Sequence, residues 1–148
     1  MKLVQNTTDI SDDVIVDMLK ELEGDNELPV AVKVRNSWVR PDFRGIFYPN
    51  FEGAKKHGCK HLITLHVPPK TTTIGFYGKT KQVLKVTTRE EGLRLIATHE
   101  TTHARLEEGS IPQTEVVCDL AMMFEAELLG VEVVEEAENE NKNPQESS

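Results

Sequence analysis

Hydrophobic residues recur at helical spacing in three stretches of the chain. In the first stretch, Ser11 suits the N-cap position, Ile10 and Ile15 suit a hydrophobic staple, and Gly24 suits the end of the helix. The apolar stripe of this helix comprises Val14, Ile15, Met18, Leu19 and Leu22. We expect this helix to be the first element of the fold and to cover a sheet.

The second helical stretch is predicted at residues 89–107. Thr88 and Glu91 form an S/T-x-x-E capping box at its start, and Gly109 suits its end. Its apolar stripe comprises Leu93, Ile96, Ala97 and Leu106. The third stretch, at residues 113–130, is predicted to be a helix closed by Gly130, with a packing stripe of Val116, Leu120, Met123 and Phe124.

Runs that are rich in β-branched residues lie mostly between the first and second helices. They predict strands at residues 28–34, 61–67, 71–76 and 82–86, with a hairpin loop at residues 77–81. Residues 54–60 are expected to form a helical turn or a loop. The sequence therefore predicts an α+β fold in which a small, partly antiparallel sheet lies beside helix 89–107.

Aromatic residues are concentrated between Trp38 and Phe51, where Pro41, Gly45 and Pro49 interrupt the pattern. We expect strand fragments and turns here, with the aromatic side chains either in the core or in a substrate pocket.

Composition limits the class of protein. The 148 residues, 38% of them hydrophobic, fit a single domain at residues 1–134. Residues 135–148 hold five acids and one base and are expected to form a disordered acidic tail. The net charge of −8 argues against nucleic-acid binding. We expect a cytoplasmic protein, because neither a membrane span nor a signal peptide is evident.

Two cysteines, Cys59 and Cys118, lack the spacing of a disulfide framework and are expected to be reduced. Cys118 is interpreted as a small buried residue between helices, with an approach to a metal as the alternative.

The second helix carries the pattern H-E-x-x-H at His99, Glu100 and His103. Two histidines four residues apart leave a helix on the same face, so both imidazoles can bind one metal ion while Glu100 reaches a water on that ion. Surface or core histidines are the alternative interpretation. A catalytic zinc site usually takes three protein ligands, and Glu115 and Asp119 share one face of the third helix.

A helix with H-E-x-x-H followed by a helix with E-x-x-x-D resembles the gluzincin metallopeptidases, and most closely the minimal ImmA/IrrE type. The resemblance covers residues 88–130. It implies a zincin-like fold in which His99, His103 and Glu115 bind zinc, Glu100 is the general base, and Asp119 orients a ligand histidine.

Eleven residues separate His103 from Glu115, which is short for this family. A tight turn between antiparallel helices would still bring Glu115 to the metal, with Asp119 or Glu125 as the substitute ligand. The metzincin pattern fails, because Leu106 and Gly109 occupy its glycine and third-histidine positions.

The remaining histidines are expected to be structural or exposed. His61 and His66 lie five apart on one predicted strand and so point to opposite faces, and His57 lies among lysines.

We therefore expect a zinc-dependent hydrolase that cleaves peptide bonds, with Glu100 as the base. A protein or peptide substrate would pair with the strand that borders the cleft. The alternative is a catalytically silent zincin-fold protein with a binding or regulatory role. The sequence indicates no particular oligomeric state.

Overall fold

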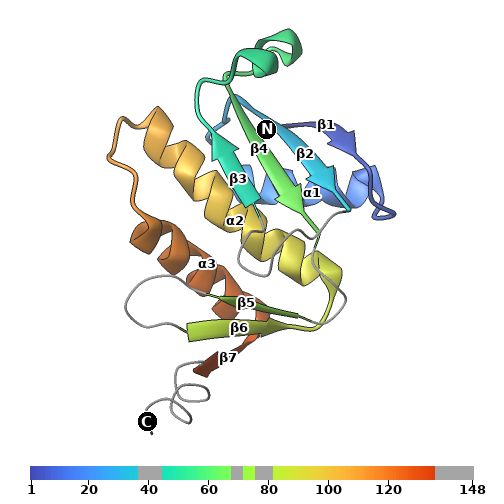
Figure 1. Cartoon of the computed structure of the whole chain (residues 1–148), viewed down its shortest axis with the longest axis vertical. Helices are drawn as coiled ribbons and strands as arrows, with labels where there is room; N and C mark the ends of the chain where they lie inside the picture. The colour runs from blue at the N-terminus through green and yellow to red at the C-terminus, as the bar shows by residue number, and fades with distance from the viewer. Residues whose placement is uncertain (37–44, 68–71, 76–81, 136–148) are drawn as a thin grey trace, which may run out of the picture.

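A mixed four-stranded sheet is built from the first half of the chain. The computed structural model describes residues 1–36, 45–67, 72–75 and 82–135 (Figure 1). The strands are β1 (Lys2–Asn6), β2 (Val30–Arg35), β3 (Gly45–Tyr48) and β4 (His61–His66), in the order β1-β2-β4-β3. β1, β2 and β4 are parallel, and β3 pairs antiparallel with β4 at one edge.

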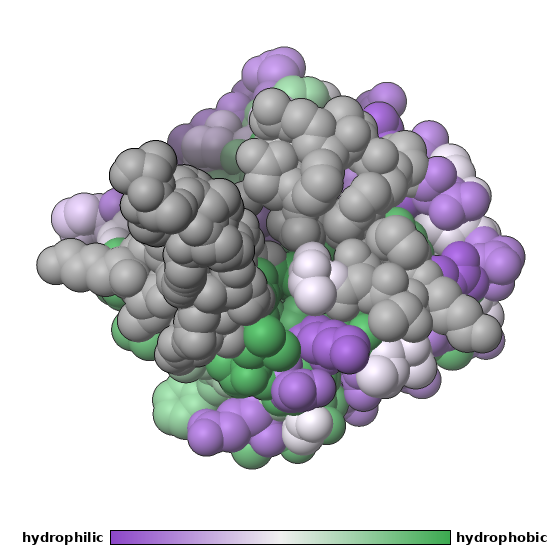
Figure 2. All heavy atoms as spheres, turned by 60° about the horizontal axis from the view of Figure 1, so that its bottom comes forward, coloured by the Kyte–Doolittle hydropathy of each residue, from purple (hydrophilic) through white to green (hydrophobic). Residues whose placement is uncertain are grey.

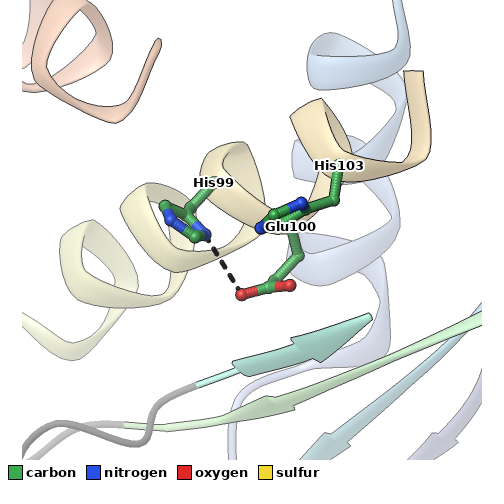
Figure 3. A group of neighbouring side chains, drawn as sticks. All are labelled: His99, Glu100 and His103. Atoms are coloured by element: carbon green, nitrogen blue, oxygen red, sulfur yellow. Dashed lines mark hydrogen bonds and ion pairs between the residues drawn. The ribbon is translucent and has the colours of Figure 1, made fainter. Parts of the chain in front are cut away.

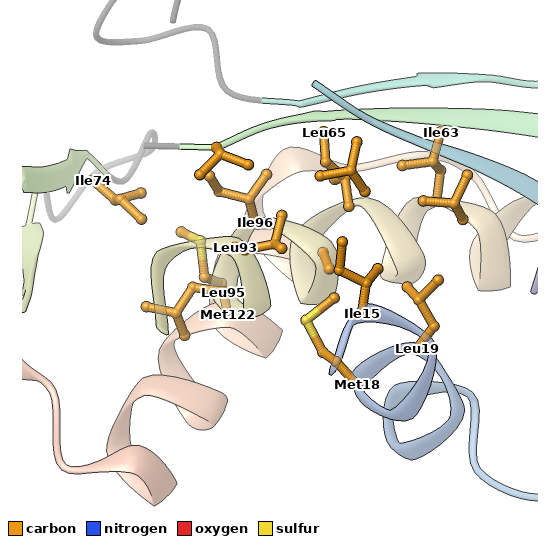
Figure 4. Close-up of a cluster of buried hydrophobic side chains, with 14 of the residues drawn as sticks. Ile15, Met18, Leu19, Ile63, Leu65, Ile74, Leu93, Leu95, Ile96 and Met122 are labelled. Atoms are coloured by element: carbon orange, nitrogen blue, oxygen red, sulfur yellow. The ribbon is translucent and has the colours of Figure 1, made fainter. Parts of the chain in front are cut away.

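Two helices, α1 (Asp12–Glu23) and α2 (Arg89–Glu108), pack on one face of this sheet. Alternate residues of β4, such as Ile63 and Leu65, point to that face and join Ile15 and Leu93 in one core (Figure 4). A 3₁₀ helix, η1 (Glu52–His57), contributes Ala54 to a smaller cluster with Ala31 and Leu62. Among the described residues, η1 thus covers part of the opposite face of the sheet.

The helix ends follow the local sequence. Ser11 accepts a hydrogen bond from the amide of Asp13, and Thr88 accepts one from the amide of Glu91, so both predicted N-caps are confirmed. Gly109 is the C-cap of α2, also as predicted, although Ser110 is the residue that takes a positive φ, of 55°.

A second sheet, which is antiparallel, lies near the N-terminal end of α2 (Figure 1). It consists of β5 (Thr72–Gly75), β6 (Gln82–Val86) and β7 (Glu132–Glu135), in that order. Ile74, Leu84 and Val86 join the main core through this sheet. The predicted strands at residues 71–76 and 82–86 are confirmed as β5 and β6.

Helix α3 (Glu115–Leu129) runs back along α2 (Figure 1). Its buried residues are Cys118, Asp119, Met122 and Ala126. The predicted packing stripe is wrong at Val116, Leu120 and Phe124, which are exposed, whereas Met123 packs against the core as predicted. With Glu115 and Asp119 turned toward α2, the three exposed side chains lie on another face of the helix, which no described element covers.

Two strands were missing from the prediction. The first element is β1 and not the first helix, and β7 follows α3 where no strand was expected. Three predictions fall outside the described residues, namely the hairpin loop, the tail beyond residue 135 and the aromatic stretch before Gly45. In the part of the chain that the structure describes, no helix has the length and apolar character needed to cross a membrane.

Candidate metal centre

The middle turns of α2 present His99, Glu100 and His103 at one place on the helix. The two imidazole rings meet edge to face, with centroids 5.1 Å apart. Glu100 is buried, and its Oε2 lies 3.2 Å from His99 Nδ1. Figure 3 shows the carboxylate of Glu100 pointing from α2 toward the sheet. The helical spacing of four thus brings the two histidines together, as predicted.

The first turns of α3 bring two carboxylates to the same place. Oε1 of Glu115 lies 3.1 Å from His99 Nε2, and Oε2 lies 3.1 Å from His103 Nε2, so this carboxylate bridges the two rings. Asp119, one helical turn later, places Oδ1 3.1 Å from the same Nε2 of His99. The short connector therefore suffices to bring Glu115 to the histidines.

Asp119 occupies a different position from the one that a ligand-orienting role implies. Such a residue contacts the ring nitrogen that points away from the metal. Asp119 instead lies with Glu115 at Nε2 of His99, while Glu100 lies at Nδ1. Asp119 is thus placed as a second carboxylate beside Glu115, and the choice of ligand between them stays a prediction.

The groups present fit a divalent cation. Two sets of side chains offer converging ligand atoms, His99 with Glu100 and His103, and His99 with Glu115 and Asp119. His99 Nε2 is buried and makes no well-aligned hydrogen bond to the described residues. Imidazole nitrogens with carboxylate oxygens are a ligand set that zinc accepts. The described residues therefore include groupings that could hold a metal ion.

The negatively charged side chains of the centre change the pKa of His99. Burial alone lowers this pKa, but the carboxylates of Asp119 and Glu100 outweigh burial and raise it from 6.5 to about 10. Attraction to Glu115 acts in the same direction. These carboxylates thus favour a positive charge at the position of His99. A bound metal ion would supply positive charge at the same place.

Gln113 is a site residue that the sequence analysis missed. Its Oε1 lies 2.7 Å from His103 Nδ1, and its Nε2 donates to the carbonyl of His103 at 3.1 Å. A proton on Nδ1 that is held by this oxygen leaves Nε2 free to bind a metal. Gln113 also ties the connector between the helices to α2. In the sequence, its position two residues before Glu115 was the one local sign that Gln113 belongs to the site.

Gly45 is a second residue that was missed, because it was interpreted as a break between strands and instead begins β3. A Cβ atom there would lie 2.9 Å from Cγ of Glu100 and 2.9 Å from Cγ2 of Ile96. The edge strand thus approaches Glu100 as closely as a residue without a side chain allows. An isolated glycine in a strand is the sequence signal for such an approach.

Phe47 links the centre to a buried histidine. Its ring stacks on His103, with centroids 6.2 Å apart and planes within 5°, and it also meets the ring of His61 at 5.4 Å. His61 is buried, accepts from the amide of Asn50 through Nδ1 and contacts Glu108 through Nε2. The prediction that His61 is structural is thereby confirmed. Of the aromatic residues between Trp38 and Phe51, Phe47 lies beside the site.

Two alternative ligands lie elsewhere. Glu125 forms an ion pair with Arg94 and belongs to neither ligand set among the described residues. Cys118 is buried, as predicted, and burial together with the charges of Glu115 and Glu100 raises the pKa of its thiol to about 12. Cys118 also belongs to neither set of converging ligand atoms among the described residues.

Comparisons of the chain with models of protein families, with curated proteins and with solved structures found no match. A functional assignment therefore depends on the geometry and the chemistry of the site.

Proposed function

We propose that the protein is a zinc-dependent peptidase of the gluzincin type. The observation that carries this proposal is the convergence of His99 Nε2 and His103 Nε2 on the two oxygens of Glu115, each at 3.1 Å, with Glu100 on the same helix. Zinc, when bound, would lower the pKa of a water and polarise the carbonyl group of the substrate.

The residues of the chain have distinct tasks in this mechanism. His99, His103 and Glu115 would hold the cation. Glu100 would accept the proton of the attacking water at its carboxylate and pass it to the leaving amine.

The arrangement of elements supports a zincin-like fold. The helix with H-E-x-x-H packs on the mixed sheet, the antiparallel strand β3 lies at its edge beside Glu100, and α3 follows with the acidic residues. An edge strand offers unpaired backbone groups to an extended peptide. We infer that the substrate is a polypeptide that pairs with β3.

Cleavage of a broad peptide library tests the proposal. Wild-type protein and the Glu100→Gln variant are loaded with zinc, their metal content is matched by elemental analysis, and peptide products are identified by mass spectrometry. We expect cleavage by the wild type and loss of cleavage in Glu100→Gln with zinc retained. Equal cleavage by both would remove Glu100 from the mechanism. Stoichiometric zinc without cleavage in either would favour the catalytically silent binding protein.

A further inference from the structure

Helix α3 exposes an apolar surface on the side that does not face α2. Val116, Leu120, Phe124 and Leu128 are spaced by four residues, so they form one stripe along the helix. Their exposures are 54%, 56%, 69% and 80%. Val133 of β7 is exposed beside them, and we call these five residues the α3 surface. Large apolar side chains that are both exposed and contiguous mark a binding surface in a folded protein.

A hollow lies within this surface. It has a volume of about 350 Å³ and is lined by Leu120, Met123, Phe124, Glu127, Val131 and Val133. Figure 2, which brings the lower end of Figure 1 forward, shows hydrophobic side chains gathered there with hydrophilic side chains beside them. A hollow of this size accepts one or more large apolar side chains.

The surroundings of the α3 surface are acidic. The described residues from Glu107 to Glu135 include no lysine or arginine and eight acidic residues, of which Glu115 and Asp119 lie at the metal centre. Glu127 lines the hollow itself, and Glu132 precedes Val133 in β7. An occupant must therefore combine apolar side chains with positive charge.

This charge argues against two other occupants. A second copy related by a two-fold axis would place the same acidic helix against itself, with no basic residue on α3 to offset the repulsion. A membrane surface carries anionic headgroups, which the same carboxylates would repel.

We propose that the α3 surface binds a segment of the substrate polypeptide whose apolar side chains are flanked by lysine or arginine. The stripe begins at Val116, directly after Glu115, so a segment bound along it leads to the metal centre. In naming the partner a substrate, this inference rests on the proposed function. Binding itself requires no catalysis and is measured separately.

The test uses full-length Glu100→Gln protein and a fluorescent amphipathic peptide of leucine and lysine. A matched peptide of leucine and glutamate and a peptide with the leucines scattered over all faces are the controls. Fluorescence anisotropy should give a Kd of roughly 1–100 μM for the leucine and lysine peptide and at least tenfold weaker binding for both controls. Equal binding of the lysine and glutamate peptides would overturn the proposal.

Variants locate the interaction on the α3 surface. Phe124→Ser combined with Leu128→Ser should weaken binding of the leucine and lysine peptide by about tenfold or more. Val14→Ser is the matched control, because Val14 on α1 is also exposed, at 49%, and lies outside this surface. Glu127→Lys should weaken binding of the lysine peptide and improve binding of the glutamate peptide. An equal effect of the control and the double variant would contradict the assignment.

Two further measurements separate the possible failures. Sedimentation velocity that finds a wild-type dimer, and a monomer for Phe124→Ser, would assign the surface to a second copy and overturn the inference. Peptide binding without any cleavage by the wild type would leave the surface in place and reject the proposed function. Cleavage that depends on Glu100 but is unaffected by the α3 variants would support the proposed function and reject the α3 surface as a site for the substrate.

Discussion

The amide oxygen of Gln113 lies 2.7 Å from Nδ1 of His103, and the amide nitrogen of Gln113 donates to the backbone carbonyl of the same histidine. One side chain thus fixes both the ring and its protonation pattern. We predict that Gln113→Ala weakens zinc binding by roughly 10–100-fold, as loss of a partner behind a ligand histidine usually does. Competition with a chromophoric chelator measures this change.

Gln113→Glu is the matched variant for this prediction. It keeps an oxygen that accepts from Nδ1 of His103, so zinc affinity should return to within a few-fold of the wild type. Circular dichroism would verify that both variants are folded. Zinc affinity unchanged in Gln113→Ala would mean that the contact positions the connector and not the ring.

The close approach of Gly45 to Glu100 predicts a second effect. In Gly45→Ala the new Cβ meets Cγ of Glu100 and Cγ2 of Ile96 at 2.9 Å, so Glu100 or the strand must shift. We expect a stability loss of roughly 1–3 kcal/mol, the usual cost of overpacking, and a fall in kcat larger than any change in zinc content. Urea unfolding, peptide cleavage and metal analysis measure the three quantities.

Gly53→Ala is the control for this substitution. The added Cβ would lie 2.8 Å from the ring of Phe51, which is an exposed side chain that can move. Activity should be retained there. If Gly45→Ala were fully active and equally stable, the spacing between β3 and α2 would not matter to Glu100.

The two carboxylates at His99 predict different responses to truncation. Glu115 reaches both Nε2 atoms, so Glu115→Ala should abolish stoichiometric zinc at micromolar protein. Asp119 contacts His99 through one oxygen, so Asp119→Ala should weaken zinc binding less than Glu115→Ala does. Glu125→Ala is the control, since Glu125 pairs with Arg94. Loss of zinc in Asp119→Ala but not in Glu115→Ala would exchange the two roles.

Local signals explain which elements the sequence predicted well. Thr88 and Gly109 define the two ends of α2 through contacts within a few residues, and the predicted strand at residues 61–67 contains all of β4. β1 was missed because its alternation is weak and its pairing with β2 joins Lys2 to Ala31. β7 pairs with β6, with Val83 opposite Val134, which is equally remote in sequence. Such pairing depends on the tertiary fold.

The candidate site likewise contains residues that local spacing predicts and residues whose positions depend on the tertiary fold. His99, Glu100 and His103 are related by helical spacing alone, so the sequence was sufficient to group them. The position of Asp119 depends on how α3 is rotated, and α3 has apolar residues on more than one face, so periodicity could not define its buried side. Gln113 acts through a connector whose path is set by packing.

The contact between Glu108 and His61 predicts a pH dependence that is independent of metal. The hydrogen bond from His61 Nε2 lowers the pKa of Glu108 below its ordinary 4.5, and Lys60 acts in the same direction. A lowered pKa in the folded state means that the unfolded chain binds more protons on acidification. This stability is therefore present above pH 4.5 and is lost as the pH falls through the lowered pKa of the folded protein.

Glu108→Gln keeps an acceptor for His61 but removes the charge. The difference in free energy of unfolding between wild type and this variant should be largest near neutral pH and should shrink steadily below pH 4.5. Urea unfolding across this range measures it, with Glu52→Gln as control, because Glu52 is highly exposed and pairs with Lys55 on the surface. If the difference in free energy of unfolding did not change as the pH was lowered below 4.5, the charge of Glu108 would contribute nothing to stability.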